Sequence, residues 1–138
     1  MHALRNLCTC LLLIFSACAS QVDMSQLGGY WQIQEVRFQN GSSKAFAYSS
    51  TVDFFQLIDE NQGILKKLDS RVDGKFFANE AEQRFTLQKD SNESVLIQIE
   101  GQELISYELK KLTTEELHLF DQKLSRLLVY RKFTPLNY

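Results

Sequence analysis

Histidine, cysteine and acidic side chains are the residues in this sequence that could support chemistry, and few of them are grouped. The chain has two histidines, and only His118 lies beyond the first few residues. Hydrolysis by a serine–histidine pair would depend on His118, and no Gly-x-Ser-x-Gly segment occurs to expose a serine nucleophile. Because His118 alternates with Leu117 and Leu119, it is predicted to lie on the opposite face of a strand from them.

Acidic residues occur as adjacent pairs, such as Glu115-Glu116 and Asp59-Glu60. Neighbouring residues of a strand point to opposite faces, so these pairs are predicted to be solubilising charges and not an acid and a base acting together. A zinc site needs three or four Cys, His or carboxylate ligands, and no suitable cluster occurs. Gly28-Gly29 is not followed by a helix and a lysine, as a phosphate-binding loop would be. The sequence predicts no catalytic residue, no metal site and no cofactor.

All three cysteines lie in the first 18 residues, at Cys8, Cys10 and Cys18. An uncharged apolar run, residues 7–15, follows Arg5 and is shorter than the ~20 residues that a membrane-spanning helix needs. A basic start, a short apolar core and small residues at its end are typical of an export signal. The segment 15–18, Phe-Ser-Ala-Cys, resembles the lipobox of bacterial lipoproteins.

That resemblance implies cleavage before Cys18, a diacylglycerol on its thiol and a fatty acyl chain such as palmitate on its new amine. The protein would then be anchored in the cell envelope, and Ala19 after the cysteine favours the outer membrane. Ordinary secretion with cleavage after Ala19 is the alternative, because Ala17-Cys18-Ala19 also satisfies the small-x-small rule. The expected division is a signal at residues 1–17, an acylated N-terminus and tether at 18–26, and one domain at 27–138.

Charged residues of both signs are interspersed along that domain. The chain has 15 basic and 17 acidic residues, with no basic run longer than doublets such as Lys66-Lys67. This balance argues against a nucleic-acid partner.

The hydrophobic pattern after Gly29 has a period of two, as in Val95, Ile97 and Ile99. A strand with this pattern buries one face and exposes the other. Turn clusters such as residues 39–43 and 89–94, rich in Asn, Asp, Gly and Ser, separate the apolar segments. Strands are predicted at 29–38, 51–58, 63–69, 74–78, 83–89, 94–100, 103–112, 115–121 and 125–133. Residues 113–116 could instead cap a helix, but the alternating segment that follows favours a turn into a strand.

Consecutive short strands at hairpin spacing, with no helices between them, predict an all-β fold. The expected architecture is a single antiparallel up-and-down β-barrel of about eight strands, because closing the sheet removes exposed edges.

The start of the first predicted strand, Gly29-Tyr30-Trp31, resembles the Gly-x-Trp motif of lipocalins and their calycin relatives. The final predicted strand contains Arg131, in the place where these families keep a basic residue that packs across the Trp ring; Arg126 is the alternative. The resemblance therefore implies that Gly29, Trp31 and Arg131 close the base of the barrel. Over the whole mature chain the pattern is similar to that of small lipocalin-like bacterial lipoproteins.

Aromatic doublets distinguish the inside of such a barrel from the outside. In each of Phe54-Phe55 and Phe76-Phe77, one ring should point inward and the other outward. The candidates for lining a ligand cavity are Phe54, Phe85, Ile97 and Tyr107.

Two functions follow from this fold. The first is non-covalent binding of a small apolar or amphiphilic ligand in the barrel mouth by a membrane-anchored protein. The alternative is a packed accessory barrel that binds another cell-envelope protein through its outer face. An open cavity favours the first function, and a filled barrel with an exposed aromatic patch favours the second.

Overall fold

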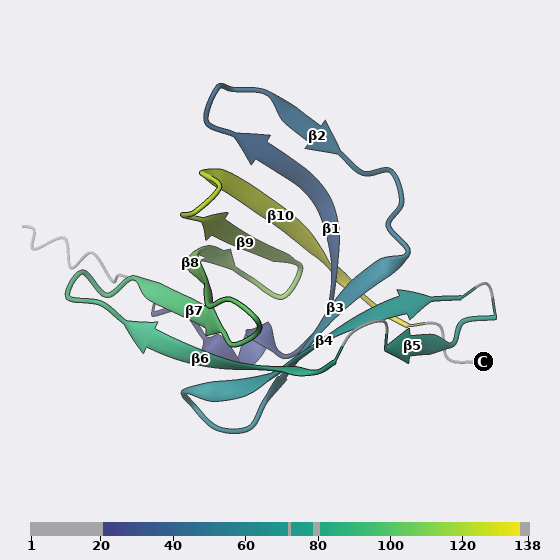
Figure 1. Ribbon diagram of the computed structural model, residues 1–138, viewed down its shortest axis with the longest axis horizontal. Helices are drawn as coiled ribbons and strands as arrows, with labels where there is room; N and C mark the ends of the chain where they lie inside the picture. The colour runs from purple at the N-terminus through teal and green to yellow at the C-terminus, as the bar shows by residue number, and fades with distance from the viewer. Residues whose placement is uncertain (1–20, 72, 79–80, 136–138) are drawn as a thin grey trace, which may run out of the picture.

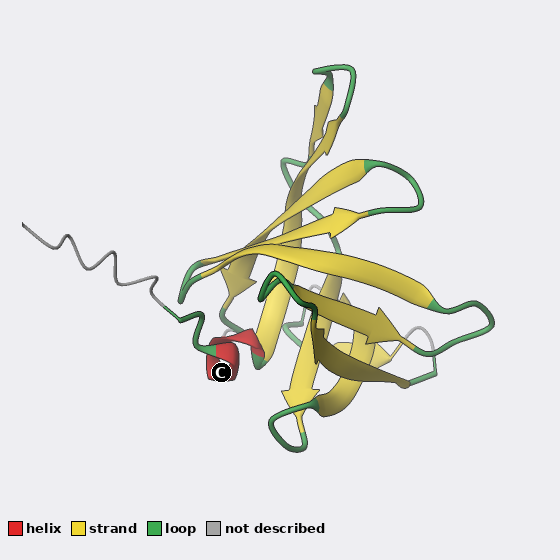
Figure 2. Ribbon diagram, turned by 90° about the vertical axis from the view of Figure 1, so that its left-hand side faces the viewer, coloured by secondary structure: helices red, strands yellow, loops and turns green. Residues whose placement is uncertain are grey.

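The computed structural model describes residues 21–71, 73–78 and 81–135, and nearly all of its regular structure is β-strand (Figure 1). One 3₁₀ turn, η1 (Met24–Leu27), precedes the strands and lies beneath one end of them (Figure 2). The strands are β1 (Gly29–Phe38), β2 (Ser43–Ala45), β3 (Thr51–Leu57), β4 (Gln62–Ser70), β5 (Phe76–Ala78), β6 (Gln83–Lys89), β7 (Val95–Ile99), β8 (Ile105–Leu112), β9 (Glu116–Asp121) and β10 (Arg126–Phe133).

Eight of these strands form a closed antiparallel ring. The order is β1, β3, β4, β6, β7, β8, β9 and β10, and β10 pairs again with β1 from Tyr30↔Phe133 to Phe38↔Arg126. Strand β2 pairs with β1, and β5 pairs with β4, so both are additions to the ring. The predicted single antiparallel up-and-down barrel of about eight strands is confirmed.

Short side chains set the reversals between strands. Thr113 Oγ1 accepts hydrogen bonds from the backbone amides of Glu115 and Glu116, which makes the predicted turn into β9. Asp59 and Asp90 accept backbone hydrogen bonds in the same way in the β3–β4 and β6–β7 turns. Two elements differ from prediction: β2 has three exposed residues and no hydrophobic alternation, and the strand expected at 74–78 is limited to the three residues of β5.

The interior of the ring is packed most tightly around Phe85 and Phe55, whose rings meet edge to face with centroids 5.5 Å apart. Gly63 lies opposite Phe85 and leaves room for it, because a Cβ there would be 2.4 Å from Phe85 Cζ and 2.3 Å from the Gln56 carbonyl oxygen. We call this part of the interior the base half. Its buried side chains are Leu27, Trp31, Phe55, Leu65, Phe85, Ile97, Leu117 and Leu119.

The base of the barrel is closed by η1 and Trp31. The indole Nε1 donates to the Leu27 carbonyl at 2.8 Å, and Lys132 Nζ lies 4.4 Å from the centroid of the indole ring. Lys132 also donates to the Gly28 carbonyl at 2.6 Å. Gly29 has φ +115°, and a Cβ there would be 2.9 Å from Lys132 Nζ, which explains the glycine of Gly-x-Trp. The glycine and the tryptophan of the motif therefore lie at the closed base of the barrel, as predicted.

The residue predicted to cover Trp31 is wrong by one position. Arg131 is exposed and pairs with Gln32, whereas Lys132 pairs with Trp31 and shares its inward direction. The alternative, Arg126, lies at the far end of β10 and bonds to Asp121. A one-residue change in the expected register moves a side chain to the other face of the sheet, which accounts for the error.

A second aromatic group packs on the outside of the barrel. Tyr30 lies against Phe54 and Phe76, with ring centroids 4.6 and 5.4 Å away, and Phe76 also meets Phe133 at 5.9 Å. Phe55 points inward and Phe54 outward, as the doublet predicts, but the choice of Phe54 as the inward member is wrong.

The doublet of β5 also differs from prediction. Phe76 packs on the outer wall and Phe77 is 48% exposed. Neither ring enters the barrel, because β5 lies outside the closed ring.

Candidate functional site

A cavity of about 250 Å³ lies inside the barrel, toward the end opposite η1. We call it the mouth cavity. Its apolar lining comes from Trp31, Ile33, Val36 and Leu128. Its polar lining includes Thr51, Asp53, Lys67, Tyr107, Arg126 and Tyr130. Pockets for drug-sized ligands usually measure ~300 Å³ or more, so this one suits a small molecule or the head of a longer one.

Asp53 and Lys67 form the first charged pair of the mouth cavity, from adjacent positions on β3 and β4. Lys67 Nζ lies 3.1 Å from Asp53 Oδ1, and the Tyr130 hydroxyl interacts with the same carboxylate. The Asp53 side chain is 10% exposed and that of Lys67 is 35% exposed. The carboxylate is therefore the buried end of this pair, and the ammonium is the end that solvent and a ligand can reach.

Asp121 and Arg126 form the second pair, across the β9–β10 turn. Asp121 Oδ1 accepts from the Leu124 amide at 3.0 Å, and Oδ2 accepts from Arg126 Nε at 3.3 Å. The Asp121 side chain is 5% exposed and that of Arg126 is 33% exposed. Asp121 thus shapes the turn and holds the guanidinium at the wall of the cavity.

Two tyrosines complete the polar lining. Burial and the charge of Asp121 raise the pKa of Tyr107, which pairs with Asp121 in the β8–β9 ladder. Burial and the charge of Asp53 raise the pKa of Tyr130 well above its ordinary value. Both phenols consequently stay protonated at neutral pH and remain hydrogen-bond donors.

Two further pockets adjoin the mouth cavity. A smaller deep pocket of about 40 Å³ shares Asp53, Lys67, Tyr107 and Tyr130 with it. That pocket in turn shares Gln83 and Ile105 with a rim pocket of about 670 Å³ between residues 81–83 and 100–105.

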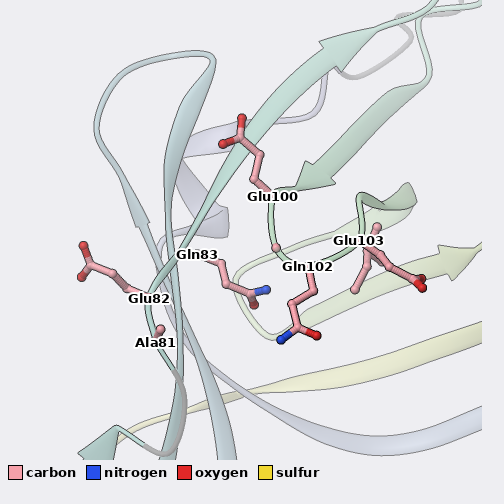
Figure 3. A pocket seen from close by; sticks show the side chains of 8 residues that line it. Ala81, Glu82, Gln83, Glu100, Gln102 and Glu103 are labelled. Atoms are coloured by element: carbon pink, nitrogen blue, oxygen red, sulfur yellow. The ribbon is translucent and has the colours of Figure 1, made fainter.

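Figure 3 shows the rim pocket, with Glu82 and Gln83 extending in opposite directions from neighbouring positions of the chain. Gly101 gives Gln83 its space, because a Cβ there would be 2.7 Å from Gln83 Nε2. The rim pocket, the deep pocket and the mouth cavity are thus neighbours at this end of the barrel.

The four predicted ligand-lining residues separate in the structure. Tyr107 lines the mouth cavity. Phe85 and Ile97 are inside the barrel and fully buried, but they belong to the base half and do not line the mouth cavity. Phe54 is outside, against Tyr30.

Sequence reasoning missed the inward charges, although their phase in the strands could have revealed them. Asp53 is two residues from Phe55, Lys67 is two residues from Leu65, and Asp121 is two residues from Leu119. Each charge therefore shares the inward face of a buried apolar residue. Hydrophobic alternation by itself marks only the apolar residues of that face, so it does not identify these charged positions as interior.

His118 lies on the outer wall, facing away from Leu117 and Leu119 as predicted. Its Nε2 is buried without a hydrogen-bond partner among the described residues. Burial lowers the pKa of His118. The part of the chain that the structure describes contains no group of three or more His, Cys, Asp or Glu residues placed to hold a metal ion.

Cys18 and the predicted signal lie outside the described residues, so the lipid anchor stays a prediction. Among residues 21–71, 73–78 and 81–135, no helix has the length and apolar character needed to cross a membrane.

No family model matches the chain, and none of the curated proteins does. Two solved structures are similar to it. A lipocalin-like protein from Bacteroides uniformis is 15% identical with a TM-score of 0.49, over 78% of this chain and 99% of that one. Lobster apocrustacyanin A1 is 11% identical with a TM-score of 0.46, over 83% of this chain and 65% of that one.

Proposed function

We propose that this chain is a lipid-anchored, non-catalytic binding protein that holds a small amphiphilic molecule at the barrel mouth. The observation that carries the proposal is the mouth cavity itself, which opens at one end of a barrel whose other end is filled. Its lining combines apolar side chains with several polar groups. Small-molecule sites have this composition, in which apolar surface supplies affinity and polar groups fix orientation.

The lining favours an amphiphilic ligand over a purely apolar one. Two ion pairs and two protonated phenols border the mouth cavity. A wholly apolar ligand would cover these groups without replacing their contacts with water, and that costs free energy. A ligand with a polar head avoids this cost.

The anchor would orient the barrel with its base toward the membrane. The predicted tether at 18–26 overlaps η1, which begins at Met24 and packs beneath the base half, while the mouth cavity lies toward the other end. Two or three acyl chains on Cys18 would give stable attachment, whereas one chain would be marginal. The mouth would then face away from the anchoring bilayer and take its ligand from the aqueous side.

Membrane fractionation tests the anchor. Cys18→Ala should move the protein from the membrane fraction to the soluble fraction, whereas Cys8→Ala, within the predicted signal, should leave it in the membrane. Unchanged fractionation of Cys18→Ala contradicts the anchor.

Native mass spectrometry of the full protein, purified from its own host in mild detergent, tests the ligand. A retained small molecule supports the binding proposal.

A retained protein and no small molecule would favour the accessory role. The exposed aromatics Tyr48 and Phe77, which are 72% and 48% exposed, support that second candidate. Exposed aromatic side chains mark a contact site where they form one contiguous patch.

A further inference from the structure

We infer that the mouth selects amphiphiles with an anionic head, such as a carboxylate, sulfate or phosphate, and that Arg126 and Tyr107 bind this head. The inference rests on the proposed function and adds the charge of the ligand and the residues that read it. It follows from which hydrogen-bonding groups face the mouth cavity and which are already occupied.

The cations are the accessible ends of both ion pairs. The side chains of Lys67 and Arg126 are 35% and 33% exposed, against 10% for Asp53 and 5% for Asp121. Both cations line the same mouth cavity. A ligand head entering from solvent therefore meets positive charge before it meets the carboxylates.

Hydrogen-bond donors are also in surplus in the mouth cavity. Arg126 uses Nε for Asp121, and its terminal amino groups make no hydrogen bond within the described ranges. The hydroxyl of Tyr107 has no hydrogen-bond partner among the described residues either, and its pKa keeps it protonated. A guanidinium binds planar anions with two parallel hydrogen bonds, and these charge-assisted bonds are about twice as strong as neutral ones.

The carboxylates are less able to bind a cationic head. Asp53 already bonds to Lys67 and interacts with Tyr130, and Asp121 bonds to the Leu124 amide and Arg126. Each carboxylate would have to accept a ligand ammonium in a nearly buried position, next to a cation that repels it. Asp121 instead acts as a positioning residue, because its bond to Nε leaves the terminal amino groups of Arg126 for a ligand.

Trp31 supplies a direct signal for testing this inference. It is the only tryptophan in the chain and lines the mouth cavity. Its fluorescence can be titrated with three ligands of equal chain length, decanoate, decanol and decylamine, all below their micellar concentrations. Acetate and inorganic phosphate test whether an anionic group without an alkyl chain is enough for binding.

We expect decanoate to bind at least tenfold more tightly than decanol or decylamine, which is the scale of a charge-assisted hydrogen bond. Acetate and phosphate should bind at least a hundredfold more weakly than decanoate. Equal or tighter binding of decanol or decylamine overturns the anionic-head inference but leaves the proposed function intact. Tight binding of acetate or phosphate points to a free anion as ligand and overturns the amphiphile. If none of the ten-carbon ligands binds, the proposed function fails.

Substitutions test which residues bind the anionic head. Arg126→Gln should weaken the binding of decanoate at least tenfold and leave the affinity for decanol unchanged. Arg131 is exposed on the same strand, so Arg131→Gln should change neither affinity. Because Arg126→Gln leaves Asp121 without its cation, its melting temperature is measured in parallel. Tyr107→Phe removes only a hydroxyl, so the variant should stay folded and bind decanoate severalfold more weakly. Full decanoate affinity in both Arg126→Gln and Tyr107→Phe would show the assignment to be wrong.

Discussion

The two halves of the barrel interior are built by the same strands but have opposite chemistry. Along β3 the inward position changes from Phe55 in the base half to Asp53 in the mouth cavity, a distance of two residues, or ~7 Å. The change from Leu65 to Lys67 on β4 follows the same rule. The inward face of a strand therefore need not be apolar along its whole length, and here its apolar part ends where the cavity begins.

This division separates stability from binding. The base half encloses side chains that are almost completely buried, and each contributes through the area that it removes from water. Around the mouth cavity, ion pairs must repay the cost of removing charges from water, so they add little stability. The comparison predicts that substitutions in the base half strongly lower the free energy of unfolding, whereas substitutions in the mouth mainly change binding.

The largest effect is expected at Phe85. Phe85→Ala leaves a cavity beneath Gly63 and should lower the free energy of unfolding by about 3–5 kcal/mol, measured by urea denaturation. Phe77→Ala, at a ring that is 48% exposed and contacts Arg71, is the control and should cost no more than about 1 kcal/mol. Equal losses for the two variants would mean that the base half is not the stabilising part of the barrel.

A smaller effect is expected when the mouth pair is broken on one side. Lys67→Met leaves the nearly buried Asp53 carboxylate without its cation and should cost about 1–3 kcal/mol in urea denaturation. The double variant Asp53→Leu, Lys67→Met should recover most of this loss, because paired charges replaced by apolar groups are often neutral for stability.

The double variant is also expected to lose ligand affinity while it stays folded. Lys66→Met is the matched control, since its ion pair with Glu82 is exposed on the outer face, and it should cost less than about 0.5 kcal/mol. If the double variant is no more stable than Lys67→Met, the mouth pair contributes to stability as the base half does, and the comparison fails.

Closure of the base gives the next prediction. Lys132→Met keeps the apolar stem over Trp31 but removes the ammonium and its bond to the Gly28 carbonyl, so a loss of about 1–2 kcal/mol is expected in thermal or urea unfolding. Arg131→Met should change the free energy of unfolding by less than about 0.5 kcal/mol, because Arg131 is exposed. A larger loss for Arg131→Met would reverse the assignment that the register supports.

The sequence was a better guide to the barrel than to its site, for a reason that Lys132 illustrates. Alternation and turn residues define strands over several positions, so an error of one residue at a strand end leaves the fold unchanged. A prediction of where one side chain points has no such tolerance, because neighbouring residues of a strand face opposite sides. Lys132 and Phe55 point inward, whereas their neighbours Arg131 and Phe54 point outward. Those two predictions therefore failed within strands that were correctly predicted.

The charged residues of the site could have been found only by extending the strand alternation from apolar positions to charged ones. Hydrophobic alternation treats a charged residue as outward, yet Asp53, Lys67 and Asp121 keep the phase of their buried neighbours. Pairing them requires knowing that β9 meets β10 across a short turn and that β3 meets β4 in register. That information is tertiary, and the period of a single strand does not contain it.

The smallest expected effect separates the outer wall from the interior. His118 is the only histidine in the described residues, and its neighbours on the outer face include Glu35, Arg37, Lys111 and Glu116. Because burial lowers the pKa of His118 in the folded protein, the unfolded chain binds more protons just below pH 6.5. Acidification through this range should therefore reduce the free energy of unfolding, by less than about 1 kcal/mol since the ring is partly exposed.

Urea denaturation of the wild type and of His118→Gln between pH 7.5 and 5.5 measures this contribution. The difference between the two proteins should be constant above the unfolded pKa of His118, and the wild type should lose stability relative to His118→Gln below it. Decanoate affinity should be the same in both proteins at every pH, because His118 faces away from the interior. A constant stability difference would show that the partner-free Nε2 accepts a proton as readily as in the unfolded chain. A difference in affinity would mean that the outer wall and the mouth are coupled, and the two faces of β9 would then no longer be independent.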